Sequence, residues 1–252
     1  MMKESLTASA HLVDKANRSA QFAAYWCRGM LLQQCLPALP EAQEWEVEIC
    51  ERPAVATMLR CTAATDGSGG RQLRELMRAS WAWVLVENGC VKYGRCGLNR
   101  EAFQTVQRSE LWAAIDLIKF FCPILSEVAD PTDHTLRVYT DHLSIVRVCC
   151  TVPWPDTRSR ANHDLWQLLQ TWLDRCPSPV AIAKVKSHVS ALFLSSTAGN
   201  AAPDDAYVGN EAADAAATVA SDESALEERD IERYQDALAE WKLIVQRIQH
   251  VY

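Results

Sequence analysis

The sequence predicts a mixed α/β domain built on one central sheet. Residues 81–87 are rich in aromatic and β-branched residues, and Asn88-Gly89, a strong hairpin signal, joins them to a second strand-like segment, 90–97. Between residues 106 and 125, apolar side chains recur at helical spacing. Further strand-like and helix-like segments alternate after them, and this order is typical of a sheet covered by helices.

We expect five strands and four helices in the middle of the chain. The strands are residues 58–65, 81–87, 90–97, 136–140 and 180–186, and the helices are residues 106–125, 144–150, 164–173 and 209–219. Residues 195–207 are rich in small and polar residues, so we expect a loop there. The chain then divides into an N-terminal helical extension (1–58), a central domain (59–220) and a C-terminal amphipathic helix (221–252).

The C-terminal segment has a seam of apolar residues at heptad spacing. The seam consists of Ile231, Tyr234, Leu238, Trp241, Val245 and Ile248. It can pack on the N-terminal segment of its own chain or pair with a second copy. Acidic residues crowd the start of the seam and would repel each other in a parallel pair, so we predict internal docking and a monomer.

The charge of the chain is unfavourable for binding nucleic acid, because such proteins usually present a basic face. The net charge is −7, but residues 60–220 contribute only −1, and residues 221–252 contribute −4. None of the ten cysteines forms a Cys-x-x-Cys pair, which leaves a zinc site without support and favours reduced core thiols. No apolar run is typical of a signal peptide or a membrane span, so we expect an intracellular protein, cytoplasmic or nuclear, without a membrane partner.

Four acidic residues occupy positions from which they can share one site. Asp66 follows the first strand, Glu110 lies near the start of a helix, Asp141 ends the fourth strand, and Asp214 lies on the last helix of the central domain. Carboxylates cannot gather unpaired in a small volume, because repulsion and burial would protonate some of them. Divalent cations remove that conflict, and two such ions can promote phosphodiester cleavage. Taken singly, each acid has a plainer explanation as a turn residue, a helix-start acid, a helix cap or a surface acid.

Several segments of residues 60–220 resemble a type 1 ribonuclease H domain. They are Ala64-Thr65-Asp66-Gly67-Ser68, Gln107-Arg108-Ser109-Glu110-Leu111-Trp112-Ala113-Ala114, Val138-Tyr139-Thr140-Asp141, Asn162-His163-Asp164-Leu165-Trp166, Val185-Lys186-Ser187-His188 and Gly209-Asn210-Glu211-Ala212-Ala213-Asp214. The resemblance implies a ribonuclease H-like fold, a five-stranded mixed sheet flanked by helices, with extra helices at both ends of the chain. It also implies an endonuclease that cuts the RNA strand of RNA–DNA hybrids and leaves 5′-phosphate and 3′-hydroxyl ends.

The same resemblance implies a role for each site residue. Asp66, Glu110, Asp141 and Asp214 would ligate two Mg²⁺ ions, which Mn²⁺ can replace. His188 would assist proton movement or product departure. Glu110 would also help to sense the ribose 2′-hydroxyl group, which distinguishes RNA from DNA.

Some positions depart from the family pattern. Val106 and Leu143 stand where polar contacts to the hybrid are common, and the segment between His188 and Asp214 is long. A basic handle is missing, because residues 151–161 offer only Arg158 and Arg160 as cations. The remaining grip would come from scattered residues such as Arg71, Arg74, Arg95, Arg108, Lys184 and Lys186.

Two alternatives therefore stay open. One is a catalytically weak or silent nucleic-acid-binding relic of a retroelement polyprotein, which the acidic charge and the two apolar substitutions favour. The other keeps the fold and acts on DNA. The intact set of four acids argues against the relic, and the motifs around Glu110 and from Gly209 to Asp214 favour the hybrid nuclease over a DNA nuclease.

Overall fold

The computed structural model describes residues 45–69, 76–99, 104–186 and 204–251, with side chains up to residue 243. The chain divides into two compact units. One comprises Ala42–Ala225, and the other comprises Met1–Glu41 together with Leu226–Tyr252.

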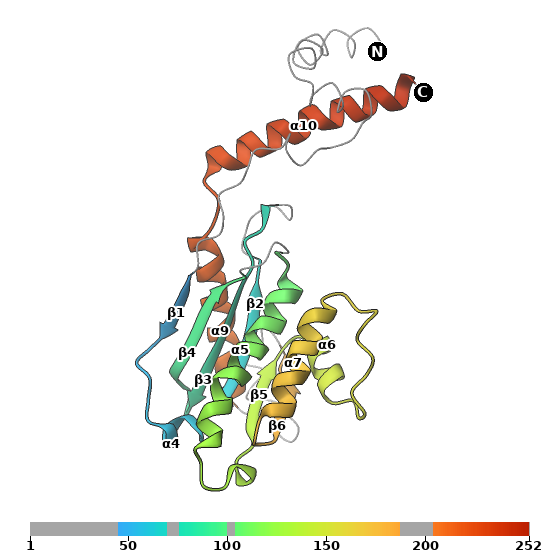
Figure 1. The fold of residues 1–252 in the computed structure, drawn as a ribbon. Helices are drawn as coiled ribbons and strands as arrows, with labels where there is room; N and C mark the ends of the chain where they lie inside the picture. The colour runs from blue at the N-terminus through green and yellow to red at the C-terminus, as the bar shows by residue number, and fades with distance from the viewer. Residues whose placement is uncertain (1–44, 70–75, 100–103, 187–203, 252) are drawn as a thin grey trace. The chain divides into compact units, whose positions relative to one another are not determined.

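The larger unit is built on a mixed sheet of six strands in the order β1-β4-β3-β2-β5-β6 (Figure 1). The strands are β1 (Glu46–Ile49), β2 (Thr62–Ser68), β3 (Ser80–Glu87), β4 (Cys90–Leu98), β5 (Leu136–Thr140) and β6 (Val180–Lys184). The first four in this order, β1, β4, β3 and β2, pair antiparallel, whereas β2, β5 and β6 pair parallel. The predicted fold class, one central mixed sheet flanked by helices, is confirmed.

Strand β1 is a sixth strand that the sequence analysis did not predict. It lies within residues 1–58, for which we expected a helical extension, and it pairs with β4 from Glu46 opposite Gly97 to Ile49 opposite Gly94. Three of its four residues are exposed and two are acidic. An edge strand is solvated on one side, so it can form without the apolar alternation that marks a strand in sequence.

The hairpin between β3 and β4 confirms the prediction made from Asn88-Gly89. Glu87 pairs with Cys90, and the two turn residues have positive φ angles of 55° at Asn88 and 71° at Gly89. Left-handed backbone at both central positions is the signature of the tight turn that matches the twist of the strands.

Both faces of the sheet are covered by helices (Figure 1). Along β3, Trp81, Trp83 and Leu85 belong to the main hydrophobic core with helices α5 (Val106–Ser126) and α7 (His163–Arg175). The alternate residues Ala82, Val84 and Val86 pack toward α9 (Asp204–Glu223). Burial on both faces explains why β3 is an almost unbroken apolar run in the sequence.

Several predicted boundaries shift in the structure. The first predicted strand was residues 58–65, but Met58 ends the short helix α4 (Val55–Met58), and β2 continues through Asp66, Gly67 and Ser68, which pair with β3. A short 3-10 helix, η3 (Pro131–Asp133), precedes β5, and α6 (Leu143–Cys149) follows it. Helix α9 already begins at Asp204, so the end of the expected loop 195–207 is helical.

The smaller unit contains α10 (Glu228–Val251), a helix that lies within the predicted C-terminal segment 221–252 and begins seven residues after its start. Ile231, Tyr234, Leu238 and Trp241 are only partly exposed, whereas most of the residues between them are exposed. This difference agrees with a seam on one face of the helix, although the side chains of Val245 and Ile248 lie outside the described residues. No helix among the described residues is long and apolar enough to span a membrane.

Candidate metal centre

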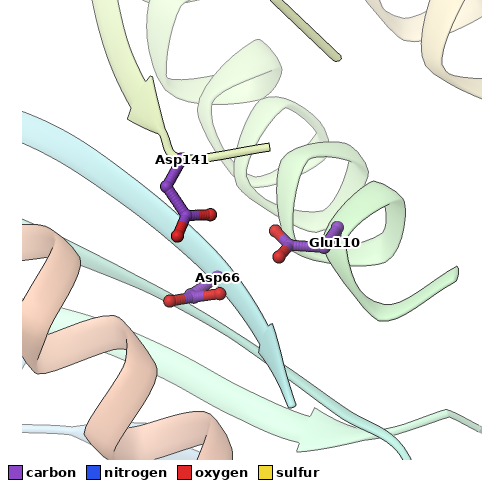
Figure 2. A group of neighbouring side chains, drawn as sticks. All are labelled: Asp66, Glu110 and Asp141. Carbon is purple, nitrogen blue, oxygen red and sulfur yellow. The ribbon is translucent and has the colours of Figure 1, made fainter. Parts of the chain in front are cut away.

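Three carboxylates meet at one end of the central strands. One oxygen from each of Asp66, Glu110 and Asp141 lies within 4.8 Å of the others. Figure 2 shows Asp66 and Asp141 on neighbouring strands, with the Glu110 carboxylate reaching toward them from a helix. Asp66 and Glu110 are almost fully buried, with 6% and 4% exposure. The structure therefore brings together three of the four predicted acids.

The pairing of β2 with β5 places the two aspartates. These strands run parallel with Thr65 opposite Thr140, and Asp66 and Asp141 are the next residues of each chain segment. Neighbouring strands lie about 4.8 Å apart, so residues that follow a paired position start from adjacent backbone sites. Asp66 and Asp141 therefore lie close together, as expected for two acids that share one site.

A glycine allows the helix to bring Glu110 to the same point. A Cβ atom at Gly67 would lie 2.6 Å from the backbone nitrogen of Glu110 and 2.8 Å from the Cβ of Ser109. Any other residue at this position would push β2 and α5 apart. The start of α5 is fixed by Thr105, whose side chain accepts a hydrogen bond from the Arg108 N–H.

The electrostatics of the cluster show why it suits a cation. Burial is the largest cause that raises the pKa of Asp66 and of Glu110, and the charges of neighbouring carboxylates raise both further. The Gly67 N–H donates to Asp66 Oδ1 at 2.7 Å, which offsets part of this effect. Among the described residues, no side-chain cation forms an ion pair with these acids, and the buried Glu110 Oε2 has no hydrogen-bond partner.

Asp214 approaches the cluster from α9. Its charge is one of the causes that raise the pKa of Asp66, so the two carboxylates interact across the sheet–helix boundary. Helix α9 packs closely because Gly209 has no side chain, since a Cβ there would lie 2.8 Å from the Cβ of Ala64. Asp214 is partly buried, but it is not among the three residues whose oxygen atoms lie within 4.8 Å of one another.

The plainer explanations for two of these acids do not fit the structure. The residue that caps α6 is His142, without a side-chain cap hydrogen bond, so Asp141 does not act as its cap. Asp66 is a paired strand residue rather than part of a turn. His188, the remaining predicted site residue, lies outside the described residues.

Two of the cations that were expected to bind nucleic acid, Arg108 and Arg95, instead form ion pairs within the protein. Arg108 is buried, and its Nη2 donates to Asp164 Oδ2 at 2.7 Å while its Nη1 donates to Asn162 Oδ1 at 3.2 Å. Arg95 pairs with Asp116 and Glu46. No local sequence pattern predicts these partners, because they lie in other elements that are distant along the chain. Lys184 remains near the centre, with its Nζ donating to the Asp141 carbonyl oxygen at 3.3 Å.

The donor set fits a divalent cation. Hard divalent ions prefer carboxylate oxygens, and a cluster of uncompensated buried acids has the excess negative charge that such an ion neutralises. Asp66, Glu110 and Asp141 could hold the ion directly, with Asp214 close enough to interact electrostatically. The cysteines that the structure describes form no such cluster, and Cys61, Cys96 and Cys122 are buried free thiols with raised pKa values.

The order of the strands, the helices on both faces and the acids at the β2–β5 end agree with the fold that the sequence motifs implied. The described strands and helices of residues 42–225 thus have the arrangement that the resemblance to a ribonuclease H-like fold implied. No protein-family model and no curated protein matches the sequence.

Some solved structures are similar to the chain at low sequence identity. LC11-RNase H1 in complex with RNA/DNA hybrid is 14% identical, with a TM-score of 0.43 over 65% of this chain and 98% of that chain. The N-terminal ribonuclease H domain of a Mycobacterium tuberculosis protein is 12% identical, with a TM-score of 0.41 over 65% and 96%. The foamy viral protease–reverse transcriptase in complex with RNA/DNA hybrid is 15% identical, with a TM-score of 0.44 over 68% of this chain and 21% of that chain.

Proposed function

We propose that this protein is a metal-dependent endonuclease that hydrolyses the RNA strand of RNA–DNA hybrids and leaves 5′-phosphate and 3′-hydroxyl ends. The observation that carries the proposal is the cluster of Asp66, Glu110 and Asp141 at the β2–β5 end of the sheet. The sequence motifs around these acids, which resemble those of type 1 ribonuclease H, point to the hybrid as substrate.

In the proposed site Asp66, Glu110, Asp141 and Asp214 hold two Mg²⁺ ions, for which Mn²⁺ can substitute. Such ions supply activation of a water molecule and neutralisation of charge on the leaving oxygen. The protein fixes the acids in place through the β2–β5 register and through the contact between Gly67 and α5. In this proposal His188 assists proton movement or product departure, and Glu110 helps to sense the ribose 2′-hydroxyl group.

The decisive experiment is a cleavage assay with a hybrid labelled on the RNA strand. The full chain should cut it when Mg²⁺ is present and stop when the ion is chelated, while duplex DNA of the same sequence stays intact. Asp141→Asn should lower cleavage by roughly 10³-fold or more, because a ligand of the reacting centre is lost, yet it should retain hybrid binding. Wild-type cleavage by that variant would show that the site is wrongly assigned.

One observation favours the catalytically silent alternative. Val106 and Leu143, within four residues of Glu110 and Asp141 in the sequence, are exposed at 38% and 40%, and neither side chain can donate a hydrogen bond to nucleic acid. The same assay separates the two functions. A silent relic would bind the hybrid and leave it uncut at every Mg²⁺ and Mn²⁺ concentration.

A further inference from the structure

A cavity lies beside the acidic cluster, between the starts of α5, α6 and α7. It has a volume of about 220 Å³, and its lining includes Gln107, Leu111, His142, Ser144, Arg160 and Asn162. Leu111 follows Glu110 directly in the sequence, and His142 follows Asp141, so the lining includes the chain neighbours of two of the three acids.

Among the residues that the structure describes, Arg160 is the only lysine or arginine that lines the cavity. It lies in residues 151–161, the segment in which a basic handle is missing. There its backbone N–H donates to the Thr157 carbonyl oxygen at 2.9 Å, and this hydrogen bond closes a turn. Its side chain is exposed and forms no ion pair with the residues that the structure describes. Its guanidinium group is therefore available to an anion.

Arg158, two residues earlier, is already paired. Its Nη2 lies 2.9 Å from Asp156 Oδ2, and its Nε donates to both carboxylate oxygens of the same residue. Arg158 and Arg160 are both exposed and lie two residues apart, but only Arg160 is free to bind an anion. This difference could not be read from their sequence positions.

The other polar groups of the cavity suit the same kind of ligand. Asn162 uses its Oδ1 to accept from Arg108, which leaves its amide N–H donors as the group it can offer. Gln107 and Ser144 add an amide and a hydroxyl that can donate. An arginine with neutral donors around it is a combination that binds phosphate oxygens.

We infer that Arg160 binds a backbone phosphate of the nucleic acid that occupies the acidic centre and so replaces the missing basic handle. The inference rests on the proposed function, because it assumes that a hybrid binds at the cluster. It assigns the cavity to one phosphodiester group, and it assigns no such contact to Arg158.

The test compares hybrid binding by the full chain carrying Asp141→Asn with that of the same chain carrying Arg160→Ala or Arg158→Ala in addition. Arg160→Ala should weaken binding by roughly tenfold and reduce the slope of log K against log salt by about 1, as expected for one lost phosphate contact. Arg158→Ala should change neither quantity. Arg160→Lys should keep the salt slope, because it retains the charge.

The strand that supplies the phosphate is identified with hybrids that carry one neutral methylphosphonate in either the RNA or the DNA strand. When the methylphosphonate replaces the phosphate that Arg160 binds, Arg160→Ala should cause no further loss of hybrid affinity, because the negative charge of that phosphate is already absent.

Two outcomes overturn the inference. One is unchanged affinity and salt slope in Arg160→Ala, and the other is an equal loss in Arg158→Ala; in either case cleavage by the wild-type chain would leave the proposed function standing. A wild-type chain that neither binds nor cuts the hybrid would overturn both.

Discussion

The position that a Cβ of Gly67 would occupy lies 2.6 Å from the backbone nitrogen of Glu110. A strand and a helix that are separated in sequence therefore touch through their main chains at the acidic cluster. Because the atom met is backbone, it cannot rotate away as a flexible side chain would.

Gly67→Ala should separate β2 from α5 and move Glu110 away from the two aspartates. We expect a loss of about 1–3 kcal/mol in the free energy of unfolding from overpacking, and roughly a 100-fold loss of hybrid cleavage from misplacement. The control is Gly69→Ala, whose Cβ would meet the end of the Met77 side chain, a group that can move. Denaturant titration and the cleavage assay measure both effects, and equal activity of the two variants would contradict the argument.

The second prediction concerns the excess charge of the cluster. Without divalent ions, Asp66→Asn should raise the melting temperature by roughly 2–4 °C at neutral pH, because it removes one of three crowded carboxylates. Added Mg²⁺ should stabilise the wild-type chain and should stabilise this variant much less.

The matched control is another largely buried acid. Asp116 accepts hydrogen bonds from Trp83 Nε1 and from Arg95 and lies outside the acidic cluster, so Asp116→Asn should leave the Mg²⁺ response intact. Calorimetric scans with and without Mg²⁺ measure these changes. A wild-type chain that Mg²⁺ fails to stabilise would count against the metal centre.

The third prediction uses the pair formed by Arg108 and Asp164, which joins α5 to α7. The hydrogen bond from Arg108 holds the pKa of Asp164 below its usual value. A lowered pKa in the folded state stabilises the fold above the unfolded pKa of about 3.9, and that contribution disappears as the pH falls through the folded value. Asp164→Asn should therefore be less stable than wild type near pH 7, and the difference should shrink below about pH 4.

Urea unfolding at a series of pH values provides the measurement. Asp156→Asn is the control, because its pair with Arg158 is fully exposed, lies within one turn and should contribute little. A stability difference for Asp164→Asn that stays constant from neutral to acidic pH would refute the assignment.

The fourth prediction concerns the seam on α10. Trp241 is partly buried and Gln235 on the same helix is exposed. We predict that the seam docks within the chain, so Trp241→Asp should lower thermal stability without changing the mass in solution, and Gln235→Asp should change neither. Light scattering that finds a wild-type dimer and a Trp241→Asp monomer would show that the seam joins two copies.

The sequence predicted the meeting of Asp66 and Asp141 because each follows a short apolar segment, and such segments pair at the centre of a sheet. It predicted Glu110 through the position of that residue near a helix start. It could not predict β1, whose exposed acidic residues lack alternation, or the continuation of β2 through Asp66-Gly67-Ser68. That continuation depends on pairing with β3 and on the close approach of α5, which are tertiary contacts without a local signal.

The ion-pair partners of Arg95 and Arg108 could not be predicted from the sequence for a similar reason. Arg108 and Asp164 are 56 residues apart, and only the packing of α5 on α7 brings them together. Residue type alone does not distinguish an arginine that is exposed on the surface from one that is buried in an ion pair. The roles of Asp214 and His188 remain predictions.

Because α9 covers one face of the sheet, the position of this helix late in the chain affects how the domain folds during protein synthesis. The face that carries Ala64, Val84 and Val86 is closed by residues from 204 onward, late in the chain. A nascent chain on the ribosome would hold Asp66, Glu110 and Asp141 long before that helix emerges, with the apolar face still in water. We therefore expect co-translational folding to wait for the last helix of the domain, and no nuclease activity from a chain that is still missing it.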